Sequence, residues 1–492
     1  MDRSKIRIIL FLLFIACPAK SETFKFYVKN EPLSLSPTKA VSGESNYVHS
    51  ILFRGLTRYN HEGMVVFEQA ERCRYIISID VRCKLKKDIK YSDGSLISAS
   101  DYATSFLDYL TPGSSTNVAQ LLFSIKNAKK YYLGQVKRED VGIKVLSENE
   151  IQFLLEEEDR EFLDKLSHPL LVPYKDEKRF NGPFVLHEIV KGKKWILKPN
   201  SYFVGGNPKR PDIEILFISD DSTAVNLYEK GKIDFLWRVP TDFIDKFKDR
   251  KDFFQLPVAR FDYIGFNQRP GKIFNDLNLR KKFATHVDFD EFKKLLSARG
   301  RAGCPGLGDG ILRESDKNCQ SFTPGKEKLS LTKKLVFNFS QLGGDDIQKQ
   351  TQWLHNQWKS NLNVNVSLKS LEQKTFIKQL KEDTPDIFRK GLALQWPSCG
   401  SALSSFRSDA PENFTGFSDP IFDRIITPFR TKKLSRYEKD VICAAAVKYL
   451  FLDKYVGIPL GLIHFSMMLN PKFKNLRLND LNQIDLSELS YE

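Results

Sequence analysis

Hydrophobic and polar residues alternate along residues 81–86, where Val, Cys and Leu are separated by Arg and Lys. This period of two is typical of a strand with one buried face. The Asp-Gly pair at 93–94 predicts a tight turn, because glycine accepts a positive φ without steric cost. Ser98 or Ser100 can then cap a helix through residues 101–110. The segment therefore predicts a strand, a turn, a short strand and a capped helix.

Similar patterns along the rest of the chain predict further strands and helices. Strands are expected at 24–28, within 141–155, at 335–339 and at 364–368, and helices within 44–60, within 220–234 and at 346–360. No internal repeat or long low-complexity linker separates these elements. At 492 residues the chain is long enough for about three domain-sized units.

The amino terminus has the pattern of an export signal. A basic start is followed by an apolar run at 8–16, which is too short to span a bilayer as a stable helix. Ala19 and Ser21 are small residues at the −3 and −1 positions, which predicts a signal peptide at 1–21. The alternative is lipidation at Cys17, because Phe-Ile-Ala-Cys is a degraded lipobox. Either way, we expect a periplasmic protein, with a possible lipid anchor.

Removal of the signal leaves six cysteines. An even number in an exported chain favours disulfides. Neighbours in the sequence suggest the pairs Cys73 with Cys83, Cys304 with Cys319, and Cys399 with Cys443. A zinc site is the alternative, but no C-x-x-C pair or nearby histidine pattern supports it.

The net charge of +15 raises the question of an anionic partner. The basic residues are spread along the chain, and runs such as 84–87 and 191–194 interrupt strand-like segments. They are therefore interpreted as solvated faces, and no nucleic-acid partner is expected.

Several short motifs occur in one order along the chain. Tyr-Ser-Asp-Gly at 91–94 is followed by Asn-Gly-Pro-Phe at 181–184, Gly-Lys-Ile-Asp at 231–234 and Tyr-Ile-Gly-Phe-Asn at 263–267, which is expected to form a strand. The block Pro169–Pro173 is expected to form a further strand, on which the chain returns after the preceding segment. Together these blocks resemble the family 5 extracellular solute-binding proteins, the peptide-type substrate-binding components of ABC importers.

The resemblance implies an α/β fold of the two-lobe periplasmic-binding-protein type, with mixed sheets, a hinge between the lobes and an additional inserted domain. It assigns residues 22–43, 167–258 and 466–492 to lobe I, 44–166 to the inserted domain and 259–465 to lobe II.

The resemblance also points to a ligand site in residues 385–406. Arg389 matches an arginine that can meet a ligand carboxylate, and a guanidinium suits that geometry. Gln395 replaces the aspartate that pairs with a peptide's amino terminus, and Trp396 occupies the neighbouring aromatic position. Ordinary free-amino peptides are therefore not assured ligands, while blocked or anionic peptides fit better.

Three further residues, Asn267, Glu31 and Ser34, are candidates for ligand contact. Each candidate also has a structural alternative. Arg389 can pair with a surface acid, Trp396 can pack in a core, and Asn267 can satisfy backbone groups at a strand end.

No zinc-protease motif, nucleophile elbow or phosphate-binding loop is present in the sequence. We therefore expect no enzyme activity, no cofactor, no metal and no catalytic residue. The leading interpretation is a monomer that captures a peptide or other polar small solute by lobe closure and delivers it to membrane permease subunits. A binding-fold sensor or scaffold that contacts another protein is the alternative, and an exported hydrolase is a third.

Overall fold

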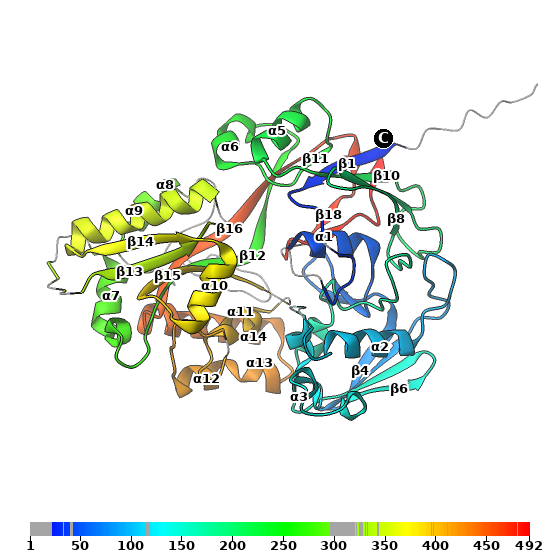
Figure 1. Cartoon of the computed structure of the whole chain (residues 1–492), viewed down its shortest axis with the longest axis horizontal. Coiled ribbons are helices and arrows are strands. Elements are labelled where there is room, and N and C mark those ends of the chain that lie inside the picture. The colour runs from blue at the N-terminus through cyan, green and yellow to red at the C-terminus, as the bar shows by residue number, and fades with distance from the viewer. Residues whose placement is uncertain are drawn as a thin grey trace, which may run out of the picture.

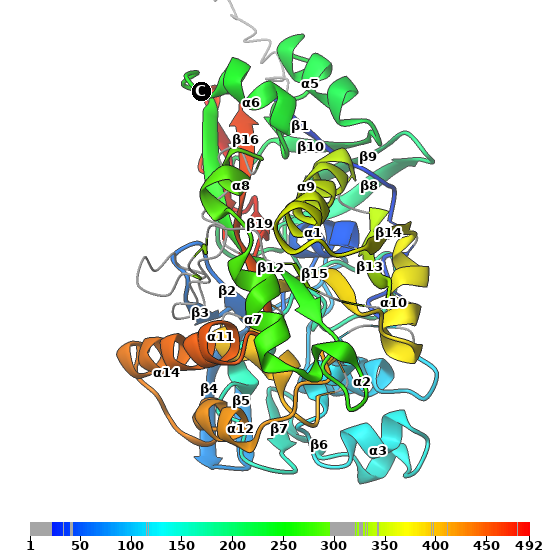
Figure 2. The same ribbon diagram turned by 90° about the vertical axis from the view of Figure 1, so that its left-hand side faces the viewer.

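A computed structural model describes residues 22–492 except 33, 40–42, 115, 117, 296–319, 321, 324–327, 330, 332, 342–343, 395, 397, 411 and 480. A ten-stranded mixed sheet, in the order β14-β13-β15-β12-β16-β11-β1-β10-β9-β8, runs through two lobes. Figure 1 shows the lobes side by side, joined by long central strands, and Figure 2 views them from the side of lobe II, with its helices in front.

Lobe I is built on one end of this sheet. Strand β1 pairs in parallel with β10, and β9 and β8 continue the sheet in antiparallel fashion. Its elements are β1 (Thr23–Val28), α1 (Gly43–Leu52), β8 (Phe184–Val190), β9 (Lys194–Pro199), β10 (Asp212–Phe217), α5 (Asp221–Glu229), β11 (Phe235–Leu236) and α6 (Thr241–Phe247). The helix α1 packs its apolar side chains into the same core as β1, β9 and β10.

Lobe II is built on the other end of the sheet. Helices cover both faces there, and each face has its own hydrophobic cluster. Trp358, fully buried in the second of these clusters, donates its indole N–H to the carbonyl of Phe283 at 2.9 Å. The elements are α7 (Leu277–Thr285), α8 (Phe289–Leu295), β13 (Leu335–Ser340), α9 (Gly344–Leu362), β14 (Val366–Leu371), α10 (Gln373–Glu382), β15 (Ile387–Ala393), α11 (Cys399–Leu403), α12 (Pro420–Ile426), α13 (Pro428–Thr431) and α14 (Arg436–Lys448).

Two long antiparallel strands, β12 (Phe253–Phe266) and β16 (Gly457–Leu469), connect the lobes. Their register shifts between Val258 and Tyr263, where the ladder is irregular. A bulge bends a strand locally and increases its twist. The crossing strands therefore form a hinge between the lobes.

A separate four-stranded antiparallel sheet forms the lower part of the molecule beneath lobe I in Figure 1. Its strands are β4 (Ala70–Ile77), β5 (Asp80–Leu85), β6 (Ile143–Ser147) and β7 (Glu150–Leu154), and α2 (Ala99–Tyr109), α3 (Ala128–Tyr132) and α4 (Phe162–Lys165) accompany them. Short strands β2 (Thr57–Tyr59) and β3 (Val65–Phe67) pair nearby.

The first predicted segment has the expected strand, turn and capped helix, but in place of the short strand after the turn it has only an isolated bridge between Lys90 and Leu96. Gly94 has a φ of +85° in the turn. Ser98 caps α2 in a capping box with Asp101, so Ser98 rather than Ser100 starts the helix. The return strand expected at 169–173 is wrong, because these residues pair with no strand. Their apolar side chains are buried even so, because Leu170 and Leu171 belong to the core beside the four-stranded sheet and Val172 belongs to the core of lobe I.

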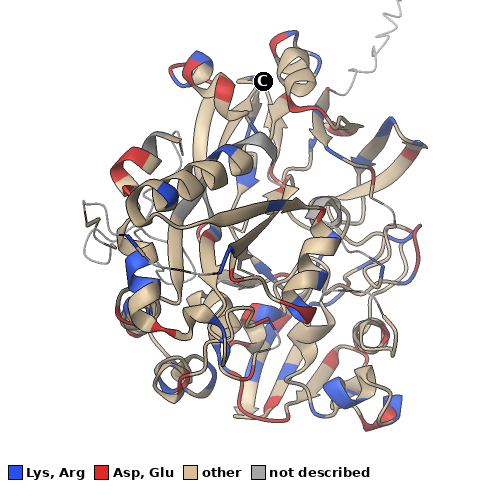
Figure 3. Ribbon diagram, turned by 60° about the vertical axis from the view of Figure 1, so that its left-hand side comes forward, with Lys and Arg blue, Asp and Glu red and all other residues tan. Residues whose placement is uncertain are grey.

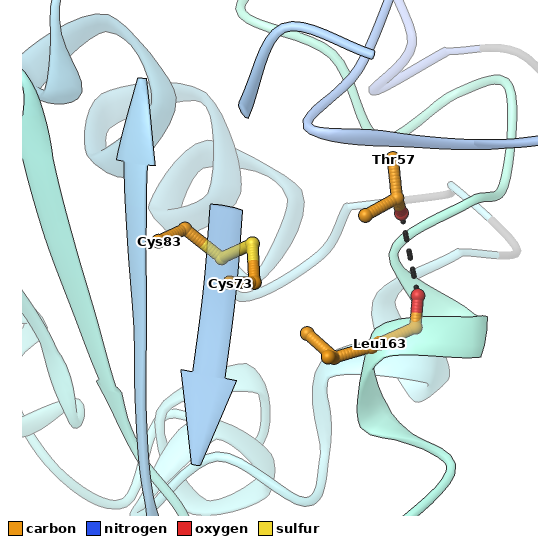
Figure 4. The surroundings of a disulfide bond; sticks show 4 residues. All are labelled: Thr57, Cys73, Cys83 and Leu163. Atoms are coloured by element: carbon orange, nitrogen blue, oxygen red, sulfur yellow. Dashed lines mark hydrogen bonds between the residues drawn. A yellow bond between two sulfur atoms is a disulfide. The ribbon is translucent and has the colours of Figure 1, made fainter. Parts of the chain in front are cut away.

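Two of the three suggested disulfides are present. Cys73 and Cys83 lie directly opposite each other on β4 and β5, with a Cα–Cα distance of 4.1 Å (Figure 4). Cys399 and Cys443 tie α11 to α14. The pair Cys304 and Cys319 lies outside the described residues, as do Cys17 and the signal at 1–21.

The tail returns to lobe I as four very short strands, β17 (Phe473–Lys474), β18 (Arg477–Leu478), β19 (Ile484–Asp485) and β20 (Ser490–Tyr491). Asp485 pairs there with Arg54 at 2.9 Å. Figure 3 shows Lys and Arg interspersed with Asp and Glu over both lobes. This distribution agrees with the interpretation of the basic residues as solvated faces.

Candidate ligand cleft

Charged side chains gather where β12 leaves the hinge. Arg260 and Asp262 lie on one face of β12, because successive strand residues point to opposite sides. The Nε of Arg260 lies 3.0 Å from Oδ1 of Asp262. On the neighbouring strand β15, Arg389 places Nη2 3.3 Å from the other oxygen of Asp262. Two guanidinium groups therefore share one carboxylate, and we call these three residues the arginine–aspartate cluster.

Burial and charge act on Asp262 in opposite directions. Its side chain is 5% exposed, and burial alone raises a carboxyl pKa. The attraction of Arg260, and then of Arg389, outweighs this effect and lowers the pKa of Asp262 below its ordinary value. Asp262 in turn raises the pKa of Arg260. The cluster therefore stays ionised and carries a net positive charge.

Gly391 makes room for the cluster. It lies directly opposite Asp262 on β15. A Cβ atom built at this position would lie 2.6 Å from Oδ1 of Asp262 and 2.7 Å from Nη2 of Arg260. Both distances are too short for a nonbonded contact, so a side chain at 391 would displace the ion pair.

The members of the cluster differ in exposure. Arg389 is 6% exposed, and its Nη2 also donates to Oε1 of Gln350 on α9 at 2.7 Å. The Arg260 side chain is 44% exposed. Arg260 is thus the cluster member that solvent reaches most easily, while Arg389 supports the cluster from within.

A pocket of about 170 Å³ lies on lobe I beside the hinge strand β16. We call it the lobe I pocket. Aromatic side chains from α1, from β16 and from the segment after β11 line it, and Tyr47 and Trp237 meet there with ring centroids 4.5 Å apart. Two cationic residues, Lys29 and Arg238, also line the pocket. The pocket and the cluster lie on the same stretch of the hinge, because the pocket residue Phe465 on β16 pairs with Leu256, four positions before Arg260 on β12.

The part of the molecule around the four-stranded sheet also meets lobe II away from the hinge, through the segment at 157–165. Glu157 forms an ion pair with Arg430, and the backbone N–H of Arg160 donates to the Arg430 carbonyl at 2.9 Å. Trp396 lies in the same region, with the Lys165 ammonium 5.0 Å from its ring centroid. Among the described residues, its buried indole N–H has no hydrogen-bond partner.

The remaining predicted ligand residues have partners elsewhere. Asn267 is 1% exposed and donates to the carbonyl of Thr384 at 2.7 Å. Glu31 accepts hydrogen bonds from the Trp195 indole and the Gly192 backbone, each at 2.9 Å. Ser34 donates to Glu177 at 3.4 Å. Gln395 lies outside the described residues. Of the five predicted ligand residues that the structure describes, only Arg389 belongs to the cluster.

In the described part of the chain, no helix has the length and apolar composition to cross a membrane. No group of three or more potential metal-binding side chains is found within those same residues.

Comparison with known proteins agrees with this architecture. The model of the bacterial extracellular solute-binding proteins, family 5 middle region, matches residues 80–414, which is more than half of the chain. The chain belongs to this family. One relative, the dipeptide-binding protein DppE of Bacillus subtilis, is 21% identical over 93% of this chain and 90% of its own length.

Two other matches extend the comparison. The probable deoxycholate-binding periplasmic protein YgiS of Escherichia coli is 24% identical over 83% of this chain and 82% of its own length. The unliganded open form of the murein tripeptide-binding protein MppA superposes with a TM-score of 0.79 at 21% identity, covering 96% of this chain and 98% of that one. This likeness establishes the fold.

Sequence reasoning missed several residues of this family 5 cleft. Arg260 and Asp262 form an Arg-x-Asp pair on a strand, and that spacing alone puts opposite charges on one face. Extending the predicted strand at 263–267 backwards would have found them. Trp237 and Arg238 gave no such signal, because their place beside the hinge depends on the fold.

Proposed function

We propose that this protein captures a peptide or peptide-like solute between its lobes and delivers it to the permease of an ABC importer. The observation that carries the proposal is the arginine–aspartate cluster at the hinge, with the lobe I pocket beside it. Ligand would favour closure through contacts that it makes only in the closed state. The relatives named for a dipeptide and a murein tripeptide support the peptide class.

The proposal includes the domain division expected from the sequence, with lobe I at 22–43, 167–258 and 466–492, an inserted domain at 44–166 and lobe II at 259–465, except that α1 is counted with lobe I, because its apolar side chains pack in the core of that lobe. Export to the periplasm, a monomeric state and the absence of enzyme activity belong to it as well. Cleavage after Ser21 yields a soluble form, while lipidation at Cys17 is the alternative that would anchor the protein.

Native mass spectrometry of the gently purified protein tests solute capture. A retained small molecule, released on denaturation and identified as a peptide, supports the proposal. Retention of another protein in place of any small molecule would instead favour a scaffold. Calorimetric titration with a defined mixture of tri- and tetrapeptides provides the second measurement, and failure of every peptide to bind would refute the peptide class.

Arg389 can be tested within the same titration. If Arg389 contacts the ligand, Arg389→Ala weakens peptide binding by about 10-fold or more, as loss of a charged hydrogen bond does. Arg424→Gln is the control, because Arg424 is exposed on α12. Unchanged affinity with lowered stability would remove Arg389 from the ligand site and leave it as a support for Asp262.

A further inference from the structure

The lobe I pocket has a mixed chemical character. Trp237, Tyr47 and Phe465 give it broad apolar walls. Its volume of about 170 Å³ exceeds the ~30 Å³ that one water occupies in the liquid. The pocket therefore has room for a chemical group of several heavy atoms, such as an extended side chain.

The two cations of the pocket are in different electrostatic situations. Lys29 places Nζ 2.9 Å from Oδ2 of Asp221, so its charge is neutralised. Arg238 is half-buried in the pocket lining, and among the described residues it forms no ion pair with an acid. The pocket thus offers one guanidinium whose charge no carboxylate of the described chain balances.

The charge beyond the pocket has the same sign. The neighbouring cluster holds two arginines against the single carboxylate of Asp262. A cation beside a second net positive group raises the electrostatic potential for anions in the space between them. The aromatic walls also reduce local hydration, which strengthens a charged hydrogen bond.

We infer that Arg238 binds a carboxylate of the solute, while the apolar stem of the same group lies against Trp237 and Tyr47. A guanidinium presents a planar set of donors that matches the two oxygens of a carboxylate. The ligand class is then an acidic peptide, with a glutamate-like side chain or a terminal carboxylate in the lobe I pocket. This inference rests on the proposed function and specifies the charge of the solute.

Matched peptides test the inference directly. The probes are tri- and tetrapeptides of alanine in which one position, moved along the chain, is Glu in one member of a pair and Gln in the other. Each is made with a free and with an acetylated amino terminus. Calorimetry should show that at least one Glu peptide binds about 10- to 100-fold more tightly than its Gln partner, the usual size of a charged hydrogen bond.

Variants of Arg238 identify the residue responsible. Arg238→Gln should bring the affinities of the Glu and Gln partners to within about threefold of each other, because the lost interaction is the one with the carboxylate. Arg238→Lys should restore part of the preference, since the charge returns without the planar donor set. Arg424→Gln removes the same charge from exposed α12 and should leave the preference intact.

The outcomes separate the two proposals. Binding of peptides without a Glu preference, or with a preference that survives in Arg238→Gln, overturns the inference and leaves the peptide-binding function standing. Failure of the whole panel to bind overturns the proposed function and the inference with it. Circular dichroism of each variant confirms that a lost preference is not a loss of fold.

Discussion

His49 makes the stability of lobe I depend on pH. Its side chain on α1 is fully buried and stacks on Phe53, with ring centroids 5.2 Å apart. Neither ring nitrogen has a hydrogen-bond partner among the described residues. Burial, with a smaller contribution from nearby His168, lowers the pKa of His49 to about 3. Burial also lowers the pKa of His168 to about 4.

The sign of the effect follows from proton uptake. An unfolded histidine has a pKa of about 6.5, so below that pH the unfolded chain binds a proton that buried His49 does not. The free energy of unfolding therefore has its full value above pH 6.5 and falls as the pH is lowered toward 3. At pH 5 the loss from His49 alone is about 2 kcal/mol, and His168 adds a similar amount.

Urea unfolding of the parent protein and of His49→Phe, each at pH 7.5 and at pH 5, measures this loss. The drop in unfolding free energy between the two pH values should be about 2 kcal/mol smaller in the variant. His61→Gln removes an exposed imidazole and should leave the drop unchanged. An equal drop in the parent and in His49→Phe would refute the reasoning, whatever the phenylalanine does to stability at pH 7.5.

Three further variants test packing and covalent links. Gly391→Ala should lower the unfolding free energy by about 1–3 kcal/mol, because the added methyl group overpacks against Asp262. Urea titration that shows parental stability would contradict the close approach of Gly391 to Asp262. Replacing Cys399 and Cys443 by Ser should lower the free energy of unfolding by about 4 kcal/mol, and replacing Cys73 and Cys83 by Ser should lower it by about 3 kcal/mol. The difference is expected because the bridge at 399–443 closes a longer loop than the bridge at 73–83. Thermal unfolding of the two double variants compares them, and the reverse order would show that native-state packing, rather than loop length, dominates.

Local structure was largely predictable from the sequence. The alternating residues at 81–86, the glycine turn and the capping serine each act within a few residues of themselves, so the pattern determines β5 and α2. The bridges at 73–83 and 399–443 were predicted for a related reason, since sequence neighbours have little loop entropy to overcome. The segment at 169–173 was mispredicted because its buried apolar residues have the composition of a strand without a pairing partner.

The ligand cleft was less predictable. Arg389 was recognised through a resemblance, but its pairing with Asp262 and Gln350 joins residues 127 and 39 positions away. The long strand β12 was seen only in its last part, because the register shift near 258–263 breaks its hydrophobic alternation. Arg238 is a candidate for ligand binding only in the folded structure, because Phe465 of the hinge strand β16 forms part of the pocket that Arg238 lines.

The sequence by itself determined the fold family, the main local elements and two of the disulfides, because these depend on short-range pattern and on an ordered set of motifs. Only the tertiary structure decided which charged residues share the cleft and which are occupied elsewhere. The physical reason is that an ion pair such as the one between Arg389 and Asp262 depends on a distance of a few ångströms between residues 127 positions apart. The sheet that passes through both lobes sets those distances, and no local pattern in the chain encodes them.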